Sequence, residues 1–296
     1  MSTEDIDPRY AELDSWSTAE MLAAMYEAQL AAAAAVQPAL GEIGRAVEDA
    51  AEALKHNGRI AYVGAGTSGR LGVQDGAELC PTFNWPRERL QFFMAGGAAA
   101  LTKSAEAAED SETDGANAIV AAMIGPADVV IGLAASGTTP YVLGAMRAAH
   151  AAGAVTIGMA NNPGAPLLAL VRHPILLNSG GEAIAGSTRM KAATAQKIAL
   201  TLFSSALMVK LGRVYGGLMV HMRATNAKLR HRAAGIVSEV TGCPFGKAAR
   251  FVEEAGGDVK TAVLIAMGRT ASEAATLLER TDGNLRAAIG AIRSSE

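Results

Sequence analysis

Five short apolar runs recur along the middle of the chain at intervals that fit helical crossovers between strands. The predicted strands are 59–64, 90–95, 128–134, 154–160 and 173–177. The predicted helices between them are about 68–79, 99–122 and 138–152. Runs such as VVIGLAA at 129–135 are apolar at nearly every position, which is typical of strands that are covered on both faces. We therefore expect an α/β fold with a mainly parallel five-stranded sheet and helices on both faces.

Helical patterns also precede the predicted sheet. The run from Ser17 to Glu20, STAE, matches a capping box and predicts an Ala-rich helix through about Ala35. Pro38 starts a second helix, which the Asn57-Gly58 pair ends with the usual C-terminal glycine. Residues 1–16 are polar and acidic, and we expect them to form an extended arm.

After about residue 212 the strand pattern stops and short helical patterns replace it. The predicted helix starts are Thr241-Gly242-Cys243-Pro244, Asp258, Thr270-Ala271-Ser272-Glu273 and Asp282-Gly283-Asn284. Helices of about ten residues are not stable alone, so we expect a small C-terminal bundle. The predicted organisation is therefore an N-terminal arm with helices at 1–57, a sheet domain at 58–212 and a helical region at 213–296.

The first candidate site is the turn that follows the first strand. Gly64-Ala65-Gly66-Thr67-Ser68-Gly69 supplies glycines for close backbone approach and two hydroxyls at the first turn of the next helix, a combination that suits an anion. A dinucleotide-binding turn would be followed by an acid at the end of the next strand, about 20 residues on, but Ala-Gly-Gly-Ala stands there at 95–98. A nucleotide P-loop would add a Lys after the glycines. Two interpretations of this turn remain: an anion-binding site, and a strand-to-helix turn without a ligand.

A second turn of the same kind follows the 128–134 strand. Ser136, Gly137, Thr138 and Thr139 combine small residues with hydroxyls, and a helix begins directly after them. Each helix terminus contributes about 0.3–1 kcal/mol to anion binding, and each hydrogen bond to a charged group about 1.5–3 kcal/mol. Either turn alone fits an ordinary helix cap, but two such turns at adjacent strand ends predict a site for one phosphate dianion.

A third polar cluster lies between the last predicted strand and a helix that begins near Lys191. It holds Glu182, Ser187, Arg189 and Lys191, which are candidate partners for the hydroxyls of a sugar phosphate. The alternative is that Ser187 and Thr188 cap the helix, while the two cations are solvated.

Composition excludes several classes of function. A net charge of −3 with both signs dispersed, and only 4% aromatic residues, argue against nucleic acid and anionic membrane as partners. Cys80 and Cys243 make no disulfide framework, and the five histidines lack metal-ligand spacing, so we expect a reduced, cytoplasmic protein without metal or cofactor. The N-terminus has no signal-peptide pattern, and the apolar run 198–209 is too short to span a bilayer.

Several motifs in order resemble one family. GAGTSGRLG at 64–72 and AASGTTPY at 134–141 look like the sugar isomerase (SIS) domain. Further motifs are Glu78 with PTF at 81–83, AEDS at 108–111 and GSTRMKAATAQK at 186–197. With GGLMV at 216–220, ATN at 224–226 and GGDVKTA at 256–262, the match runs over nearly all of 15–290. Together they resemble the N-acetylmuramic acid 6-phosphate etherases. The resemblance implies an SIS-type, flavodoxin-like fold, a homodimer, and a lyase that releases D-lactate from its amino-sugar phosphate.

The resemblance also implies roles for individual residues. Glu78 would be the proton donor and Glu109 the second catalytic acid, while the phosphate would be held by Thr67, Ser68, Ser136, Thr138 and Thr139. The family often has Glu-Cys-Pro-Pro-Thr where this chain has Glu-Leu-Cys-Pro-Thr at 78–82, and Gly-Gly-Glu at 96–98 where this chain ends in Ala98. From the acidic run alone, Glu109 would be assigned to a solvated helix face.

Two other functions fit the same expected fold. One is a sugar-phosphate isomerase that uses two acids to move a proton between C1 and C2. The other is a non-catalytic sugar-phosphate sensor that regulates a kinase through the helical C-terminal region.

Overall fold

The computed structural model describes residues 1–55, 57–103 and 106–294 of the 296-residue chain. The chain forms two compact units. The first unit contains Met1–Ala77 and Arg87–Ser205, and the second contains Glu78–Pro86 and Ala206–Glu296.

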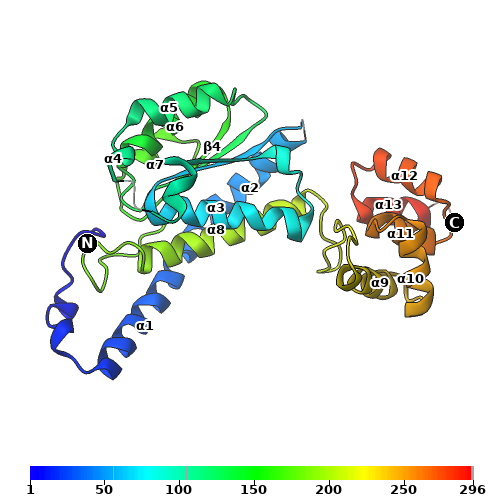
Figure 1. Ribbon diagram of the computed structural model, residues 1–296, viewed down its shortest axis with the longest axis horizontal. Coiled ribbons are helices and arrows are strands. Elements are labelled where there is room, and N and C mark those ends of the chain that lie inside the picture. The colour runs from blue at the N-terminus through cyan, green and yellow to red at the C-terminus, as the bar shows by residue number, and fades with distance from the viewer. Residues whose placement is uncertain (56, 104–105, 295–296) are drawn as a thin grey trace. The chain divides into compact units, whose positions relative to one another are not determined.

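The first unit is built on a parallel sheet (Figure 1). Its strands are β1 (Ile60–Gly64), β2 (Leu90–Met94), β3 (Val129–Leu133), β4 (Val155–Ala160) and β5 (His173–Leu176). They lie in the order β2-β1-β3-β4-β5, and every neighbouring pair is parallel. The predicted five-stranded parallel sheet is therefore confirmed. Because β2 and β3 lie on opposite sides of β1, the strand order reverses at β1 and β3.

Helices cover both faces of this sheet, as predicted (Figure 1). One face carries α5 (Glu112–Ala121), α6 (Pro140–Ala151) and α7 (Pro166–Leu170). On the other side lie α2 (Leu40–Leu54), α3 (Gly66–Phe83) and α8 (Lys191–Lys210). Alternate strand residues point to opposite faces: Ala61 and Val63 pack into the core under α6, whereas Tyr62 lies against Gly72 of α3.

The predicted helix 99–122 is wrong as a single element. In its place stand a 3-10 turn, η5 (Gly97–Leu101), then α4 (Glu106–Glu109) and then α5, while residues 104 and 105 lie outside the described residues. Ser111 causes the last break, because it adopts an extended conformation and its side chain accepts a hydrogen bond from the Asp114 amide. The break leaves Glu109 at the end of its own short helix.

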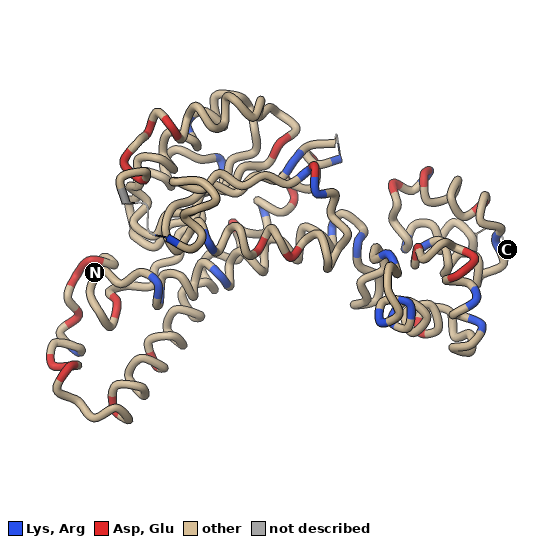
Figure 2. Tube along the Cα trace, in the orientation of Figure 1, with Lys and Arg blue, Asp and Glu red and all other residues tan. Residues whose placement is uncertain are grey.

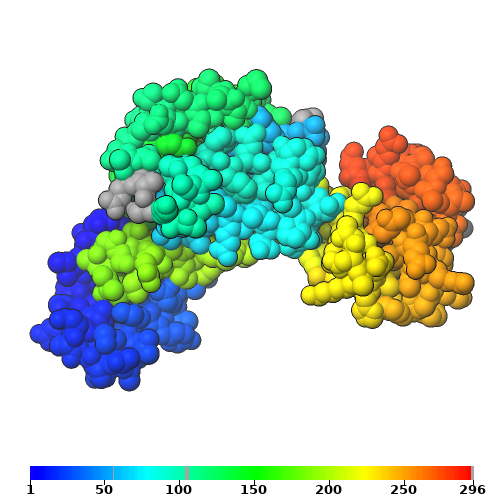
Figure 3. Space-filling view, in the orientation of Figure 1, coloured from blue at the N-terminus to red at the C-terminus, as the bar shows by residue number. Residues whose placement is uncertain are grey.

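The N-terminal arm differs from the expected extended segment. It contains two 3-10 turns, η1 (Pro8–Tyr10) and η2 (Leu13–Ser15), before α1 (Thr18–Ala34), which has the predicted capping box between Ser17 and Glu20. Thr3 is fully buried. Its amide donates to Asn162 Oδ1 (2.9 Å), and its carbonyl accepts from the Gly186 amide (3.0 Å). The arm therefore lies against residues near 186 (Figure 3), and most of its charges are acidic (Figure 2).

The second N-terminal helix ends earlier than the sequence predicts. A 3-10 turn, η3 (Gln37–Ala39), leads into α2, which ends at Leu54, and position 56 lies outside the described residues. The left-handed residue in this connection is Asn57, with φ 63°, not Gly58. Gly58 serves close packing instead, because a Cβ there would lie 1.7 Å from the Ala127 carbonyl oxygen.

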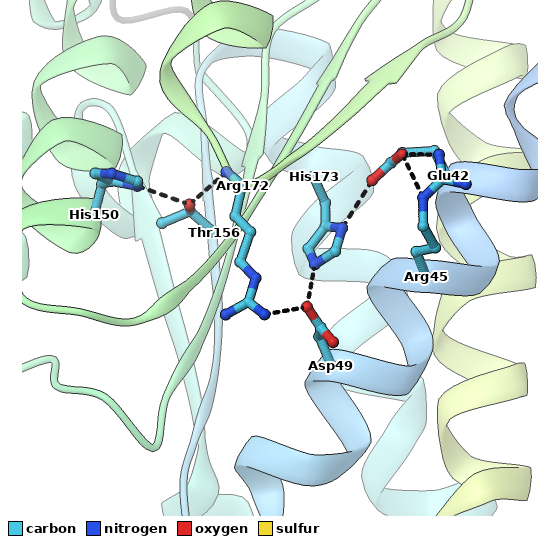
Figure 4. Close-up of polar contacts among 7 residues, drawn as sticks. All are labelled: Glu42, Arg45, Asp49, His150, Thr156, Arg172 and His173. Carbon is cyan, nitrogen blue, oxygen red and sulfur yellow. Dashed lines mark hydrogen bonds and ion pairs between the residues drawn. The ribbon is translucent and has the colours of Figure 1, made fainter.

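A polar cluster joins α2 to the edge strand β5 (Figure 4). The buried ring of His173 faces Glu42 through Nδ1 (2.8 Å) and Asp49 through Nε2 (2.9 Å), and each carboxylate is also paired with an arginine, Arg45 or Arg172. Only a doubly protonated imidazole can donate to both carboxylates. The cluster therefore joins a helix to the open edge of the sheet, and its two arginine–carboxylate pairs are charge-assisted.

Glu42 makes the stability of this unit depend on pH. Burial raises the pKa of Glu42, but the hydrogen bonds with His173 and Arg45 outweigh it and leave the pKa below the ordinary 4.5. A carboxylate whose pKa is lower in the folded than in the unfolded state stabilises fully above the unfolded pKa, and this contribution disappears as the pH falls through the folded pKa. Glu42→Gln should lower the free energy of unfolding at pH 7 by about 1–3 kcal/mol and flatten its dependence on pH in the acid range.

Urea unfolding followed between pH 3 and pH 7 measures this effect. The matched control is Glu52→Gln on the same helix, where Glu52 and its partner Lys55 have side chains that are 67% and 60% exposed, so little change is expected. Equal losses from the two substitutions would contradict the role assigned to the His173 cluster.

Helix α8 is longer than the apolar run in the sequence suggested. It has 20 residues and a mean hydropathy of 1.3 in its most apolar window, so by length and composition alone it could cross a membrane, and the argument from twelve residues is wrong. This is weak evidence for a membrane, because 56% of that window is buried inside the protein. Core helices of soluble proteins can have the same length and composition. The hydroxyl of Ser204 donates to the buried Asp75 of α3 (3.0 Å), which in turn accepts from Tyr62 of β1 (2.8 Å).

The second unit is helical. Its helices are α9 (Ala227–Thr241), α10 (Phe245–Glu254), α11 (Val259–Ala266), α12 (Ala271–Arg280) and α13 (Leu285–Arg293). Side chains of Asp258, Thr270 and Asn284 cap α11, α12 and α13, as the sequence predicts. The start of α9, which Asn226 caps, is not among the predicted helix starts.

Burial lowers the pKa of Lys260 and of His221 in this unit. Lys260 is only 3% exposed and donates to the Gly283 carbonyl, and burial lowers its pKa to about 8. Burial, with the nearby charges of Lys260 and Arg213, lowers the pKa of His221 to about 3, so this ring is neutral at pH 7.

Candidate active site

The two hydroxyl-rich turns leave neighbouring strands at the same edge of the sheet. Gly64 at the end of β1 pairs with Leu133 at the end of β3, so the turns that follow them start side by side. This is also the place where the strand order reverses, and ligands of open α/β sheets bind outside the carboxyl ends of strands at such a point. The strand order thus brings together the two turns that the sequence singled out.

The first turn brings α3 very close to the end of β1. Gly66 begins the helix with φ 52°, and a Cβ on Gly69 would lie 2.4 Å from Met94 Sδ and 2.8 Å from the Gly64 carbonyl carbon. Thr67 is half-buried and Ser68 is buried in the first helical turn. The glycines thus allow the backbone amides at the start of α3, with these two hydroxyls, to surround an anion.

The second turn is organised around Ser136. Its Oγ accepts from the Thr138 amide (3.2 Å) and from Thr138 Oγ1 (3.0 Å). Gly137 has φ 71°, and a Cβ there would lie 2.4 Å from that of Ala165. Thr139 stands at the N-cap of α6, yet its side chain makes no capping hydrogen bond. An ordinary cap therefore does not account for the Thr139 hydroxyl.

Glu109 lies beside the first turn, which the sequence alone did not indicate. It is half-buried, and a Cβ on Gly66 would lie 3.4 Å from Glu109 Oε1. The two residues share the wall of a cavity of about 120 Å³ with Thr67 and other residues. The solvated helix face that the acidic run favoured is wrong, because the short helix α4 turns this carboxylate towards the start of α3.

Glu78 lies on the same helix as Thr67 and Ser68, three residues before Pro81. The sequence predicts a helix that ends at about residue 79, but α3 continues past Pro81 to Phe83. Glu78 is exposed and belongs to the segment Glu78–Pro86, which is part of the second unit. It is not among the residues that line the cavity beside Glu109. Its catalytic role stays a prediction.

The third polar cluster is tied mainly to the start of α8. Glu182 is 1% exposed, and its carboxylate accepts from the amides of Lys191 (2.8 Å) and Ala192 (2.9 Å). The ammonium of Lys191 donates to the Gly181 carbonyl (2.8 Å), and burial lowers the pKa of Lys191. Glu182, not Ser187 or Thr188, therefore caps the helix, and Lys191 is buried instead of solvated.

The outer part of the third cluster remains accessible. Ser187 is half-buried and Arg189 is exposed. A contact of Glu182, Ser187, Arg189 or Lys191 with a sugar stays a prediction.

Two cations near Glu109 were not among the predicted site residues. Arg70 and Lys103 both line the 120 Å³ cavity. Arg70 directly follows Gly69 within the GAGTSGRLG motif, whereas Lys103 follows η5 and lies in no motif of small residues and hydroxyls. The sequence signal that could have indicated Lys103 is its position as a cation directly before the acidic run at 106–112.

The fold and the paired turns define a protein of the SIS class. Residues 42–150 match the family model described as the glucokinase regulatory protein N-terminal SIS domain. The chain is 53% identical over 289 residues to an N-acetylmuramic acid 6-phosphate etherase from Deinococcus radiodurans, covering 97% of this chain and 95% of the relative. It is 43% identical to the enzyme of that name from Rubrobacter xylanophilus, over 97% of this chain and 95% of the relative. The chain belongs to the N-acetylmuramic acid 6-phosphate etherase family.

Proposed function

We propose that this protein is a carbon–oxygen lyase that cleaves the D-lactyl ether of N-acetylmuramic acid 6-phosphate. The products are N-acetylglucosamine 6-phosphate and D-lactate, a step in the recycling of peptidoglycan amino sugars. The observation that carries the proposal is the identity of 53% with an etherase over nearly the full length of both chains. Residues 58–212 form the sugar-phosphate-binding domain in this proposal.

The reaction needs one base, one acid and no redox change. In the open-chain sugar the C1 aldehyde acidifies the C2 proton, which a base removes while an acid protonates the departing ether oxygen at C3. Lactate leaves and a C2–C3 double bond forms. Water then adds to C3 and a proton returns to C2, which gives the product. A neutral acid and an ionised base are required together, and two carboxyl groups in different surroundings can supply them.

The site residues take the following roles in the proposal. The phosphate lies at the β1 and β3 turns and is bound by Gly66, Thr67, Ser68, Ser136, Gly137, Thr138 and Thr139. Glu109 removes the C2 proton, as the second catalytic acid that the AEDS motif at 108–111 implies. Glu78 protonates the ether oxygen and later activates water. Since Glu78 is exposed in a single protomer, this role requires bound sugar and a second protomer to cover it.

Turnover in heavy-oxygen water tests the reaction directly. Elimination followed by rehydration places the label on C3 of the product, which fragmentation in a mass spectrometer separates from label exchanged into the C1 aldehyde. Label in the released lactate would show cleavage of the other ether bond and contradict the proposal. An isomerase would convert the sugar without lactate, and a sensor would show a ligand-dependent thermal shift without turnover.

We also propose that the protein works as a homodimer in the cytoplasm. Leu22, Tyr26 and Leu30 of α1 are 62%, 64% and 54% exposed, and their spacing of four residues places them on one stripe of the helix. A second copy would remove this apolar stripe from water. Cys80 and Cys243 are both free, which suits a reducing compartment.

A charge on this stripe should separate the protomers. Tyr26→Glu with Leu30→Glu is expected to halve the sedimenting mass and to reduce lactate release, since burying two carboxylates in an interface costs several kcal/mol. The matched control is Val120→Glu on α5, another apolar residue that is 68% exposed, which should change neither. An unaltered sedimentation coefficient in the double variant would place the interface elsewhere, and an active monomeric wild type would contradict the dimer.

A further inference from the structure

The cavity beside Glu109 is lined by charged residues of both signs. Its lining comes from the start of α3, the end of β2, the η5 segment and α4, all within the first unit. The lining residues are Gly66, Thr67, Arg70, Met94, Ala95, Ala100, Lys103 and Glu109. It thus combines one carboxylate with two cations, next to a helix N-terminus that itself attracts negative charge.

The two cations differ in what they already bind. The guanidinium of Arg70 donates from Nη2 to the Ala100 carbonyl (2.9 Å) and from Nε to the Leu101 carbonyl (3.1 Å), so it holds η5 against α3. Lys103 is fixed through its backbone, because its amide donates to the Ala99 carbonyl (3.0 Å). Within the described parts of the chain its ammonium has no hydrogen bond or ion pair. Lys103 is therefore the cation that can bind an incoming anion.

The volume of the cavity limits what it can hold. At about 120 Å³ it has room for roughly four water molecules, each with a share of about 30 Å³ of liquid volume. Pockets that enclose a whole drug-sized ligand measure about 300 Å³ or more. The cavity can therefore take one small branch of a sugar phosphate, but not the sugar itself.

We propose that this cavity is the subsite for the D-lactyl group and that Lys103 binds its carboxylate. The inference rests on the proposed function, in which Glu109 acts at C2. The lactyl ether oxygen is on C3, the carbon bonded to C2, whereas the phosphate on C6 is at the other end of the carbon chain. A carboxylate beside Glu109 would be repelled by it, and the ammonium of Lys103 offsets that repulsion. The same contact selects substrates that carry a carboxylated ether.

The test compares two ligands that differ only in the lactyl group. In Lys103→Met the KM for N-acetylmuramic acid 6-phosphate should rise by about 10- to 100-fold, the loss of one charge-assisted hydrogen bond. The inhibition constant of N-acetylglucosamine 6-phosphate, which has the phosphate but no lactyl carboxylate, should stay within about twofold, because no contact with it is removed. Lys103→Arg should restore most of the affinity for the substrate.

The controls separate this inference from the proposed function. Lys247→Met replaces an exposed lysine of α10 and should change neither constant, and thermal melting of each variant reports folding. If both ligands weaken equally in Lys103→Met, the lysine binds the phosphate and the subsite is wrong. If neither weakens, Lys103 does not contact the substrate. A wild-type protein that releases no lactate would instead defeat the proposed function itself.

Discussion

Replacing Glu78 by Gln should reduce the rate of lactate release by about 10²- to 10⁴-fold, the contribution of general acid–base catalysis. The amide has the shape of the carboxyl group but cannot give a proton to the departing ether oxygen. Glu78 lies on α3 well beyond the turn that is proposed to bind the phosphate, so binding of the product should remain. The measurements are lactate release under single turnover and the thermal shift produced by N-acetylglucosamine 6-phosphate.

A neighbouring acid provides the control for this result. Glu88 is also exposed, and Glu88→Gln makes the same chemical change without a proposed role, so its rate should equal that of the wild type. A Glu78→Gln protein of near-normal rate would remove Glu78 from the mechanism. A variant that loses both turnover and product binding would assign Glu78 to binding rather than to proton transfer.

Replacing Glu109 by Gln should abolish a different step. If Glu109 is the base, Glu109→Gln loses the exchange of the C2 proton with deuterium from heavy water, together with about 10²- to 10⁴-fold in lactate release. In Glu78→Gln the exchange should persist although the ether bond is not cleaved. Nuclear magnetic resonance of the C2 position during incubation in heavy water measures this difference.

The paired experiment assigns the two roles. Asp110→Asn changes the next residue, which is exposed, and should leave both exchange and turnover intact. Exchange that is lost in Glu78→Gln but kept in Glu109→Gln would reverse the two assignments. Normal exchange and turnover in Glu109→Gln would remove this carboxylate from the reaction, in spite of its position beside Gly66.

Glu109 and Glu182 illustrate the limits of sequence reasoning. Glu109 stands in an acidic run that favours a solvated helix face, yet it ends the short helix α4 before the Ser111 cap of α5, and its carboxylate reaches the start of α3. Glu182 and Lys191 stand in a polar cluster that suggests a ligand site, yet both are bonded to the backbone around the start of α8. In each case the deciding contact joins residues from different elements, which no local pattern encodes.

Local patterns along the chain were enough to predict the strands, the parallel sheet, several helix caps and the two hydroxyl-rich turns. These features depend on local physics, since an apolar run of a given length, a glycine at a tight turn or a capping side chain acts on its immediate neighbours. The folded chain was needed to show the strand order that places the β1 and β3 turns side by side, the docking of the N-terminal arm, and the cavity that Lys103 and Glu109 both line. Those features depend on which surfaces bury each other, and burial is a property of the whole fold.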